Sequence, residues 1–157
     1  MKIVLLSVGK TTHEYIKNEL LSYSQRLSHY SKFESIEITS VKSSVKLSRI
    51  ESKRVEGGLI RKHISKDDYV ILLDEKGKAF TSIEFSKKIE KYMLNSFKRI
   101  VFVIGGPFGF ADEIYELSDE KMSLSNMTFS HQMIRLFFIE QLYRAFTIIN
   151  NEKYHHQ

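Results

Sequence analysis

The chain has no cysteine and only one proline among its 157 residues, and charged side chains interrupt every apolar run. Without cysteine there is no disulfide framework, thiolate nucleophile, zinc ribbon or iron–sulfur cluster. No stretch approaches the roughly 20 uninterrupted apolar residues of a membrane span, and the apolar start is too short for a secretory signal. The six histidines show no metal-ligand spacing. We therefore expect a cytoplasmic protein with no membrane partner and no metal.

The net charge of +5 is concentrated in one segment. Residues 42–66 contain eight basic and two acidic residues, whereas the rest of the chain has sixteen basic and seventeen acidic ones. A localised positive face suits a polyanion such as RNA, because neutralised phosphates release counterions. The alternative is a helix face kept charged for solubility.

Segments with strand character alternate with segments of helical period. Strands are expected at 2–8, 33–41, 69–73, 101–104 and, running into a loop, 122–129. Five helices are expected. Three begin with a capping box, at Thr11–Glu14, at Ser48–Glu51 and at Thr81–Glu84; the second of them covers 47–64, where Gly57–Gly58 weakens or breaks it, and the other two helices cover 111–117 and 130–150. Residues 74–78 are expected as a turn. The alternation predicts an α/β fold with a mostly parallel sheet and helices on both faces, in one domain spanning 1–157.

The apolar strand 101–104 leads directly into Gly105, Gly106, Pro107, Phe108 and Gly109. Adjacent glycines after a buried strand allow a ligand to approach the backbone, at the end of the sheet where α/β proteins bind ligands. The alternative is a tight strand-to-helix connection. The turn lacks the Lys-Ser/Thr of a P-loop and the spacing of a dinucleotide fingerprint, so kinase and dehydrogenase functions find no support.

Apolar residues surround most of the circumference of the last expected helix. Such a helix must be buried on two sides. The second side most economically meets a symmetry partner, which predicts a homodimer; the alternative is a central helix within a monomer.

Four motifs occur in order along the chain: Ile104–Gly109, Ser123–Leu124–Ser125 leading to His131, Leu142–Tyr143–Arg144–Ala145, and Tyr154–His155. Together they resemble the ribosomal RNA large-subunit methyltransferase H family (RlmH), a member of the SPOUT class. The resemblance covers essentially the whole chain.

The resemblance implies a carboxyl-terminal trefoil knot that forms a pocket for S-adenosylmethionine, and a homodimer. It also implies methylation of N3 of a pseudouridine in the helix 69 loop of large-subunit (23S) rRNA, on assembled ribosomes. The cofactor residues carried over are Leu73, Gly105, Leu124, Ser125, Asn126, Met127, Thr128 and Phe129. A loop of small side chains leaves its backbone available to adenine, although a leucine that ends a strand is often simply core.

N3 of pseudouridine carries a proton at neutral pH, so the reaction needs a group that removes the proton or stabilises the anion. Arg144 is expected to stabilise the anion or hold a phosphate, and His155 to accept the proton or bind the base. Alternatively, Arg144 only pairs with Glu140 one helical turn earlier. Tyr154 and His156 are expected to contact the substrate, although His156 stands where the family commonly has arginine.

Two other functions remain open at this point. One is a non-catalytic basic module that binds RNA or the ribosome without the cofactor. The other is a methyltransferase of the same fold that acts on tRNA or another rRNA site. A second departure from the family is Ser130 in place of proline, where serine can cap the last helix.

Overall fold

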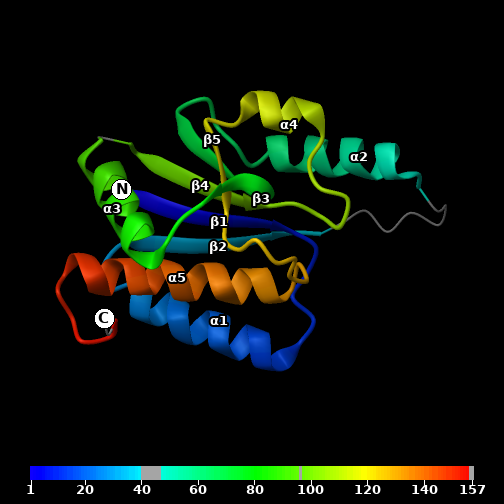
Figure 1. Cartoon of the computed structure of the whole chain (residues 1–157). Helices are drawn as coiled ribbons and strands as arrows, with labels where there is room; N and C mark the ends of the chain where they lie inside the picture. Colours follow the sequence, from blue (N-terminus) through cyan, green and yellow to red (C-terminus); the bar gives the residue numbers. More distant parts are fainter. Residues whose placement is uncertain (40–46, 96, 156–157) are drawn as a thin grey trace.

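The computed structural model describes residues 1–39, 47–95 and 97–155 (Figure 1). In chain order the elements are β1 Lys2–Val8, α1 Glu14–Leu27, β2 Lys32–Ile38, α2 Arg49–Arg61, β3 Asp68–Ala79, α3 Ser82–Leu94, β4 Arg99–Ile104, α4 Asp112–Leu117, β5 Glu120–Ser123 and α5 Met133–Ile149.

The five strands form one sheet in the order β2-β1-β4-β3-β5, and every strand pair is parallel. β4 is central, which agrees with its five consecutive buried residues, 100–104. Helices α1, α3 and α5 cover one face of the sheet, and α2 and α4 cover the other (Figure 1). The predicted parallel sheet with helices on both faces is confirmed. The knot is consistent with this topology and stays a prediction.

β3 is longer than predicted, because the stretch expected as a turn continues the strand to Ala79. β5 pairs first with Ile71–Leu73 and then with Lys78–Ala79, with a register shift between Leu73 and Lys78. Gly77 lies at this irregularity, and a Cβ there would sit 2.6 Å from the backbone of Met122. The prediction of a turn was wrong because Gly77 serves close packing of two strands.

Replacing Gly77 by alanine is expected to lower the free energy of unfolding by about 2 kcal/mol, because the new methyl group overlaps backbone that cannot rotate away. Gly58→Ala is the matched control, since a Cβ at Gly58 meets nothing within 4 Å and alanine favours a helix interior by about 0.5–1 kcal/mol. Chemical denaturation of both variants measures the difference. An unchanged midpoint for Gly77→Ala would contradict this account of β3 and β5.

α2 continues without a break through Gly57 and Gly58, and the predicted weakening of the helix there stays a prediction. Gly57 permits close contact with α4, because a Cβ there would lie 2.8 Å from Glu113 Oε1 and 3.2 Å from Ala111 Cβ. The capping boxes at Ser48 and Thr81 are confirmed, each with both reciprocal hydrogen bonds. β2 is an edge strand that ends at Ile38, and Val41, the end predicted for it, lies outside the described residues.

α5 packs on the sheet and against both α1 and α3, so much of its apolar circumference is buried within one chain. Phe137 nevertheless stays 38% exposed and packs against Phe129, with ring centroids 4.4 Å apart. Ser130 precedes the helix N-cap by two residues, and its hydroxyl accepts a hydrogen bond from the Met133 amide at 3.3 Å. Within the described ranges, no helix is long and apolar enough to cross a membrane.

Candidate active site

A cavity of about 1000 Å³ lies at the carboxyl end of β4 and beside Leu73, where the pairing of β3 with β4 ends. Six segments line it: residues 73–76 after the first part of β3, the turn 104–110, the loop 123–131 after β5, the first turns of α2, Asp112 and Tyr115 of α4, and Ile134 of α5. In parallel α/β sheets this edge is where ligands bind, because the connections diverge from the strand ends.

The turn 104–110 is tightly folded. The Gly109 amide donates to the Gly106 carbonyl at 3.1 Å, and Gly109 has a φ of +76°, which favours glycine. A Cβ at Gly105 would lie 3.0 Å from the buried Phe110 ring. Glycine at these positions therefore sets the shape of the cavity wall.

The loop after β5 is shaped by its own serine side chains. Ser123 Oγ donates to the Ser125 carbonyl at 2.8 Å, and Ser125 Oγ accepts from the Met127 amide at 2.9 Å. Such local bonds hold the backbone in a turn without a helix or a strand. Met127 is 75% exposed, so an apolar side chain stands open at the cavity rim.

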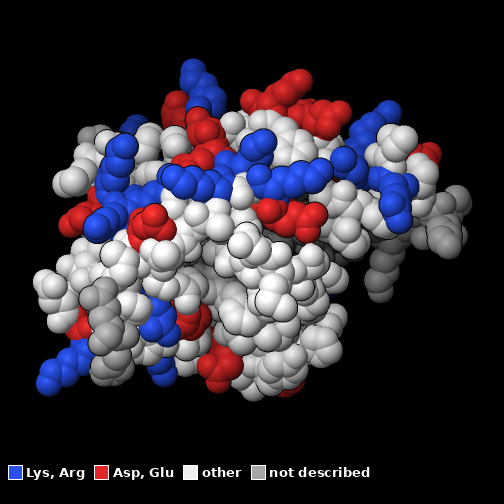
Figure 2. All heavy atoms as spheres, viewed as in Figure 1, with Lys and Arg blue, Asp and Glu red and all other residues white. Residues whose placement is uncertain are grey.

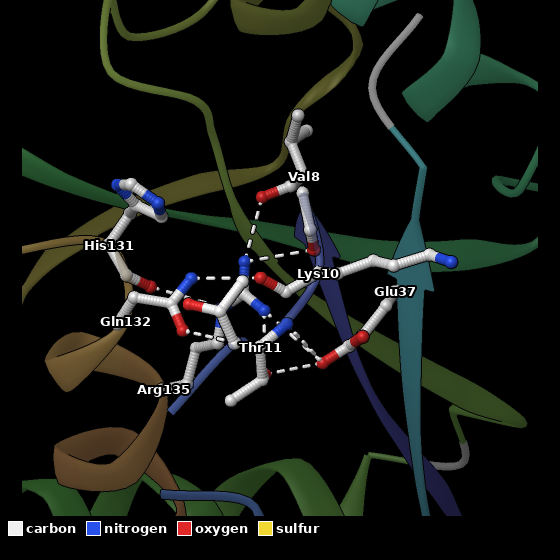
Figure 3. Close-up of polar contacts among 9 residues, drawn as sticks. Val8, Lys10, Thr11, Glu37, His131, Gln132 and Arg135 are labelled. Atoms are coloured by element: carbon white, nitrogen blue, oxygen red, sulfur yellow. Dashed lines mark hydrogen bonds and ion pairs between the residues drawn. The ribbon is translucent and has the colours of Figure 1, made fainter. Parts of the chain in front are cut away.

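The far end of this loop is anchored by Arg135, whose side chain is 1% exposed (Figure 3). Its Nη2 donates to the carbonyls of Val8 at 2.8 Å and Gly9 at 3.0 Å, and its Nε donates to the His131 carbonyl at 3.0 Å. Its Nη1 donates to Thr11 Oγ1 at 2.8 Å and to Glu37 Oε1 at 3.2 Å. Burial lowers the pKa of Arg135, but a guanidinium stays charged.

Gln132 adds a second tie between the same two loops. Its Oε1 accepts from the Thr12 amide at 2.9 Å, and its Nε2 donates to the Lys10 carbonyl at 2.8 Å (Figure 3). The segment after β1 and the segment before α5 therefore form one polar unit beside the cavity. This unit also explains why the predicted capping box at Thr11 was wrong: the Thr11 hydroxyl bonds Glu37 and Arg135, and His13 is the N-cap without a side-chain bond.

Comparison with known proteins shows the family to which the chain belongs. The model of a family described as "Predicted SPOUT methyltransferase" matches residues 1–155. The chain belongs to the SPOUT methyltransferase family. It is 53% identical to a protein of Parabacteroides distasonis, 51% to one of Christiangramia forsetii and 50% to one of Flavobacterium psychrophilum, each over the full length of both chains. All three are named "Ribosomal RNA large subunit methyltransferase H", so the resemblance that the motifs indicated is confirmed.

Most of the cofactor residues predicted for this SPOUT chain surround the cavity: Leu73, Gly105, Leu124, Ser125, Met127, Thr128 and Phe129. Asn126 lies on the same loop and is exposed, but it is not among the lining residues. The structure thus brings three separate segments of the chain to one cavity. Contact of these residues with a cofactor stays a prediction.

The predicted catalytic residues lie elsewhere in this SPOUT chain. Arg144 Nη2 pairs with Glu140 Oε1 at 2.5 Å, and Nη1 lies 3.4 Å from His155 Nδ1. Tyr154 OH donates to the same Glu140 oxygen at 3.1 Å, and the Arg144 guanidinium stands 4.8 Å from the Tyr154 ring centroid. Burial raises the pKa of Tyr154, and the hydrogen bond shared with Tyr23 and the nearby Glu140 charge raise it further, so its hydroxyl stays protonated.

The cluster of Glu140, Arg144, Tyr154 and His155 is separate from the cavity within one chain. Ile134 lines the cavity, and Arg144 follows ten residues later on α5, about 15 Å along the helix axis. Arg144 does pair with Glu140 one helical turn earlier, as the alternative predicted. The catalytic role of Arg144 stays a prediction. His156 lies outside the described residues.

Several cavity residues were not among the predicted site residues. His131 lines the cavity, and burial together with the Arg135 charge lowers its pKa, so it is neutral at pH 7. Asp74 accepts a hydrogen bond from Tyr115 OH, and burial and this bond raise the pKa of Tyr115 to about 12. An isolated charge in an apolar helix was a signal for Arg135, but nothing local indicated Tyr115. Among the described residues, no group of three or more His, Cys, Asp or Glu side chains can hold a metal ion.

Glu56 lies behind the glycine turn with a buried oxygen, Oε2, that has no hydrogen-bond partner in the described parts of the chain. A Cβ at Gly106 would overlap this oxygen, so the carboxyl group packs directly against the turn. Burial raises the pKa of Glu56 above its ordinary 4.5. A raised carboxyl pKa means that the folded state binds the proton more tightly than the unfolded state.

Glu56→Gln is therefore expected to raise the melting temperature at neutral pH, where the wild type buries a charge. The wild type gains stability as pH falls through the folded-state pKa towards the unfolded value of 4.5, so the advantage of the variant is expected to shrink over that window. Thermal unfolding at pH 7 and at about pH 5 tests both parts. A lower melting temperature for the variant at pH 7 would show that the Glu56 charge is paired.

Proposed function

We propose that the protein is a cytoplasmic enzyme that transfers a methyl group from S-adenosylmethionine to N3 of a pseudouridine in the helix 69 loop of 23S rRNA, on assembled ribosomes. The main support is the cavity at the carboxyl end of β4 and beside Leu73 of β3, which combines bare backbone, small polar side chains and apolar walls. The relatives' names support a large-subunit rRNA substrate, because they match over their full length. The pseudouridine and the ribosome come from the family resemblance.

The cavity residues fit S-adenosylmethionine. A volume of about 1000 Å³ is at the upper end for small-molecule sites and leaves room for part of an acceptor base. The turn from Gly105 offers backbone close to the ligand, and the serine-shaped loop 123–130 presents main-chain donors and acceptors together with the side chains of Leu124 and Phe129. Bound there, S-adenosylmethionine would supply a sulfonium methyl group for transfer to N3, which loses its proton.

Arg144 and His155 are the groups that we assign to the acceptor nitrogen. A permanent guanidinium charge would stabilise the anion of the deprotonated base, and His155 Nδ1 or its other ring nitrogen would take the proton. Arg144 donates two hydrogen bonds to Glu140 Oε1, and the Tyr154 hydroxyl donates to the same oxygen. These contacts orient the guanidinium before substrate binds. Tyr154 and His156 are the proposed substrate contacts of the tail.

We further propose that a homodimer brings the two parts of the site together, since they lie about 15 Å apart along α5. Figure 2 shows a broad uncharged surface over the amino-terminal halves of α5 and α1. Its exposed apolar side chains include Tyr15, Phe129 and Phe137. A two-fold axis on this surface, with the two α5 helices antiparallel, would place Arg144 of the partner subunit beside the cavity.

The decisive experiment is transfer of labelled methyl from S-adenosylmethionine to intact ribosomes whose target uridine is already pseudouridine. Isolated 23S rRNA, tRNA and ribosomes with unmodified uridine are the controls. Label on the pseudouridine-containing ribosomes alone is expected. Label only on tRNA or free rRNA would establish another substrate, and no label together with no cofactor binding would leave a non-catalytic RNA-binding module.

A further inference from the structure

The rim of the cavity carries two basic side chains from α2. Arg49 and Lys53 both line the cavity, and their spacing of four residues places them on one face of the helix. They belong to the basic segment in which the positive charge of the chain is concentrated. The structure therefore connects one part of that segment to the reaction site.

Among the described residues, these two side chains have no carboxylate partner. The ion pairs in the same ranges involve Arg99, Arg135, Arg144 and three lysines, but neither Arg49 nor Lys53. The Arg49 guanidinium stands 5.5 Å from the ring centroid of Phe108, a residue of the glycine turn that is 43% exposed. An arginine stacked on an exposed aromatic ring is typical of surfaces that bind unstacked RNA bases and their phosphates.

The position of α2 keeps this rim open. The proposed dimer surface lies over α1 and α5. α2 packs on the opposite face of the sheet. Figure 2 shows a band of Lys and Arg side chains across the upper half of the molecule, on the side where Figure 1 places α2. A polyanion that follows this band would reach the cavity without displacing the partner subunit.

We propose that Arg49 and Lys53 bind backbone phosphates of the substrate RNA next to the methylated nucleotide and thereby place its base at the cavity. This inference rests on the proposed function, because it needs an RNA substrate that enters the cavity. It divides the basic segment into two parts. The first turns of α2 position the acceptor, whereas Arg61 and Lys62 add only general attraction. These two residues lie at the other end of the helix, and Arg61 is about 12 Å from Lys53 and about 18 Å from Arg49 along the axis.

The test compares two double variants that remove the same charge from the same helix. Arg49→Ala with Lys53→Ala removes the rim pair, and Arg61→Ala with Lys62→Ala is the matched control. The rim variant is expected to raise the KM for ribosomes by about tenfold. It is also expected to lower the slope of log affinity against log salt by about 0.7–0.9 for each phosphate that the variant no longer binds. The control variant is expected to show a smaller change in both quantities.

Affinity for S-adenosylmethionine, measured by calorimetry, is expected to be the same in both variants and in the wild type. Arg49→Lys with Lys53→Arg should restore most of the ribosome affinity, because the charges remain. If both double variants behave alike, the positioning role of the rim pair is wrong. If the wild type itself transfers no methyl group, the proposed function fails instead, so the two failures are distinguishable.

Discussion

Replacing Arg144 by alanine is expected to lower kcat for methyl transfer by about 100-fold or more, which is the usual cost of removing one preorganised group that stabilises a developing anion. Affinity for S-adenosylmethionine is expected to stay unchanged, because Arg144 is assigned to the acceptor nitrogen and not to the cofactor. Single-turnover methylation and calorimetric cofactor binding measure the two quantities separately.

Arg26→Ala is the matched control for Arg144. Arg26 lies 5.8 Å from the ring centroid of Tyr143, the residue that precedes Arg144, but its contacts are with the Tyr23 and Tyr143 rings and not with Glu140 or His155. The kcat of the Arg26→Ala variant is expected to be close to that of the wild type. Arg144→Lys keeps the charge without the planar fork, so an intermediate kcat is expected. A normal kcat in Arg144→Ala would reduce Arg144 to a structural partner of Glu140.

Mixed dimers test the proposed composite site directly. A subunit with Arg144→Ala still has an intact cavity, and a subunit with a bulky residue at Gly105 still has an intact Arg144. If the catalytic group comes from the partner subunit, mixing the two inactive variants is expected to restore part of the activity, since one complete site forms in each mixed dimer. No recovery despite mixed dimers would show that both parts act within one chain.

Arg135→Met is expected to lower the free energy of unfolding by about 3–5 kcal/mol, because it leaves the carbonyls of Val8, Gly9 and His131 without their donor in a buried place. A domain of this kind has about 5–15 kcal/mol in total, so the variant would be only marginally folded. Urea denaturation measures the loss. The effect is expected to be large because one side chain joins two loops.

Two further variants make the Arg135 result interpretable. Arg135→Lys keeps the charge but cannot reproduce the fork of donors, so an intermediate loss is expected. Arg54→Met removes an exposed arginine of α2 and is expected to change stability by less than about 0.5 kcal/mol. If Arg135→Met were as stable as Arg54→Met, the polar unit beside the cavity would not be what holds the two loops.

Local patterns predicted most of the elements, because strand and helix periods are properties of short segments. The capping boxes at Ser48 and Thr81 were correct since each involves residues three apart and no distant competitor. The box at Thr11 failed because Glu37 and Arg135, which are 26 and 124 residues away, bind the Thr11 hydroxyl. A pattern of four residues cannot reveal such partners.

In the candidate site too, local features could be predicted from the sequence and contacts between distant segments could not. The glycine turn and the loop 123–131 could be singled out from the sequence, because their unusual residues stand next to a buried strand. Tyr115 and the α2 residues Arg49 and Lys53 could not, since they reach the cavity only through the packing of α2 and α4 around it.

By itself the sequence determined the parallel α/β sheet, the glycine-rich end of β4 and the family, because these depend on local period and on motifs in a fixed order. Only the tertiary structure decided that β3 runs on past Leu73 and that Gly57 and Gly77 serve close packing. It also decided that Arg144 lies apart from the cavity of its own chain. These features depend on which distant segments meet, and contacts between distant segments are not encoded in any single stretch of the chain.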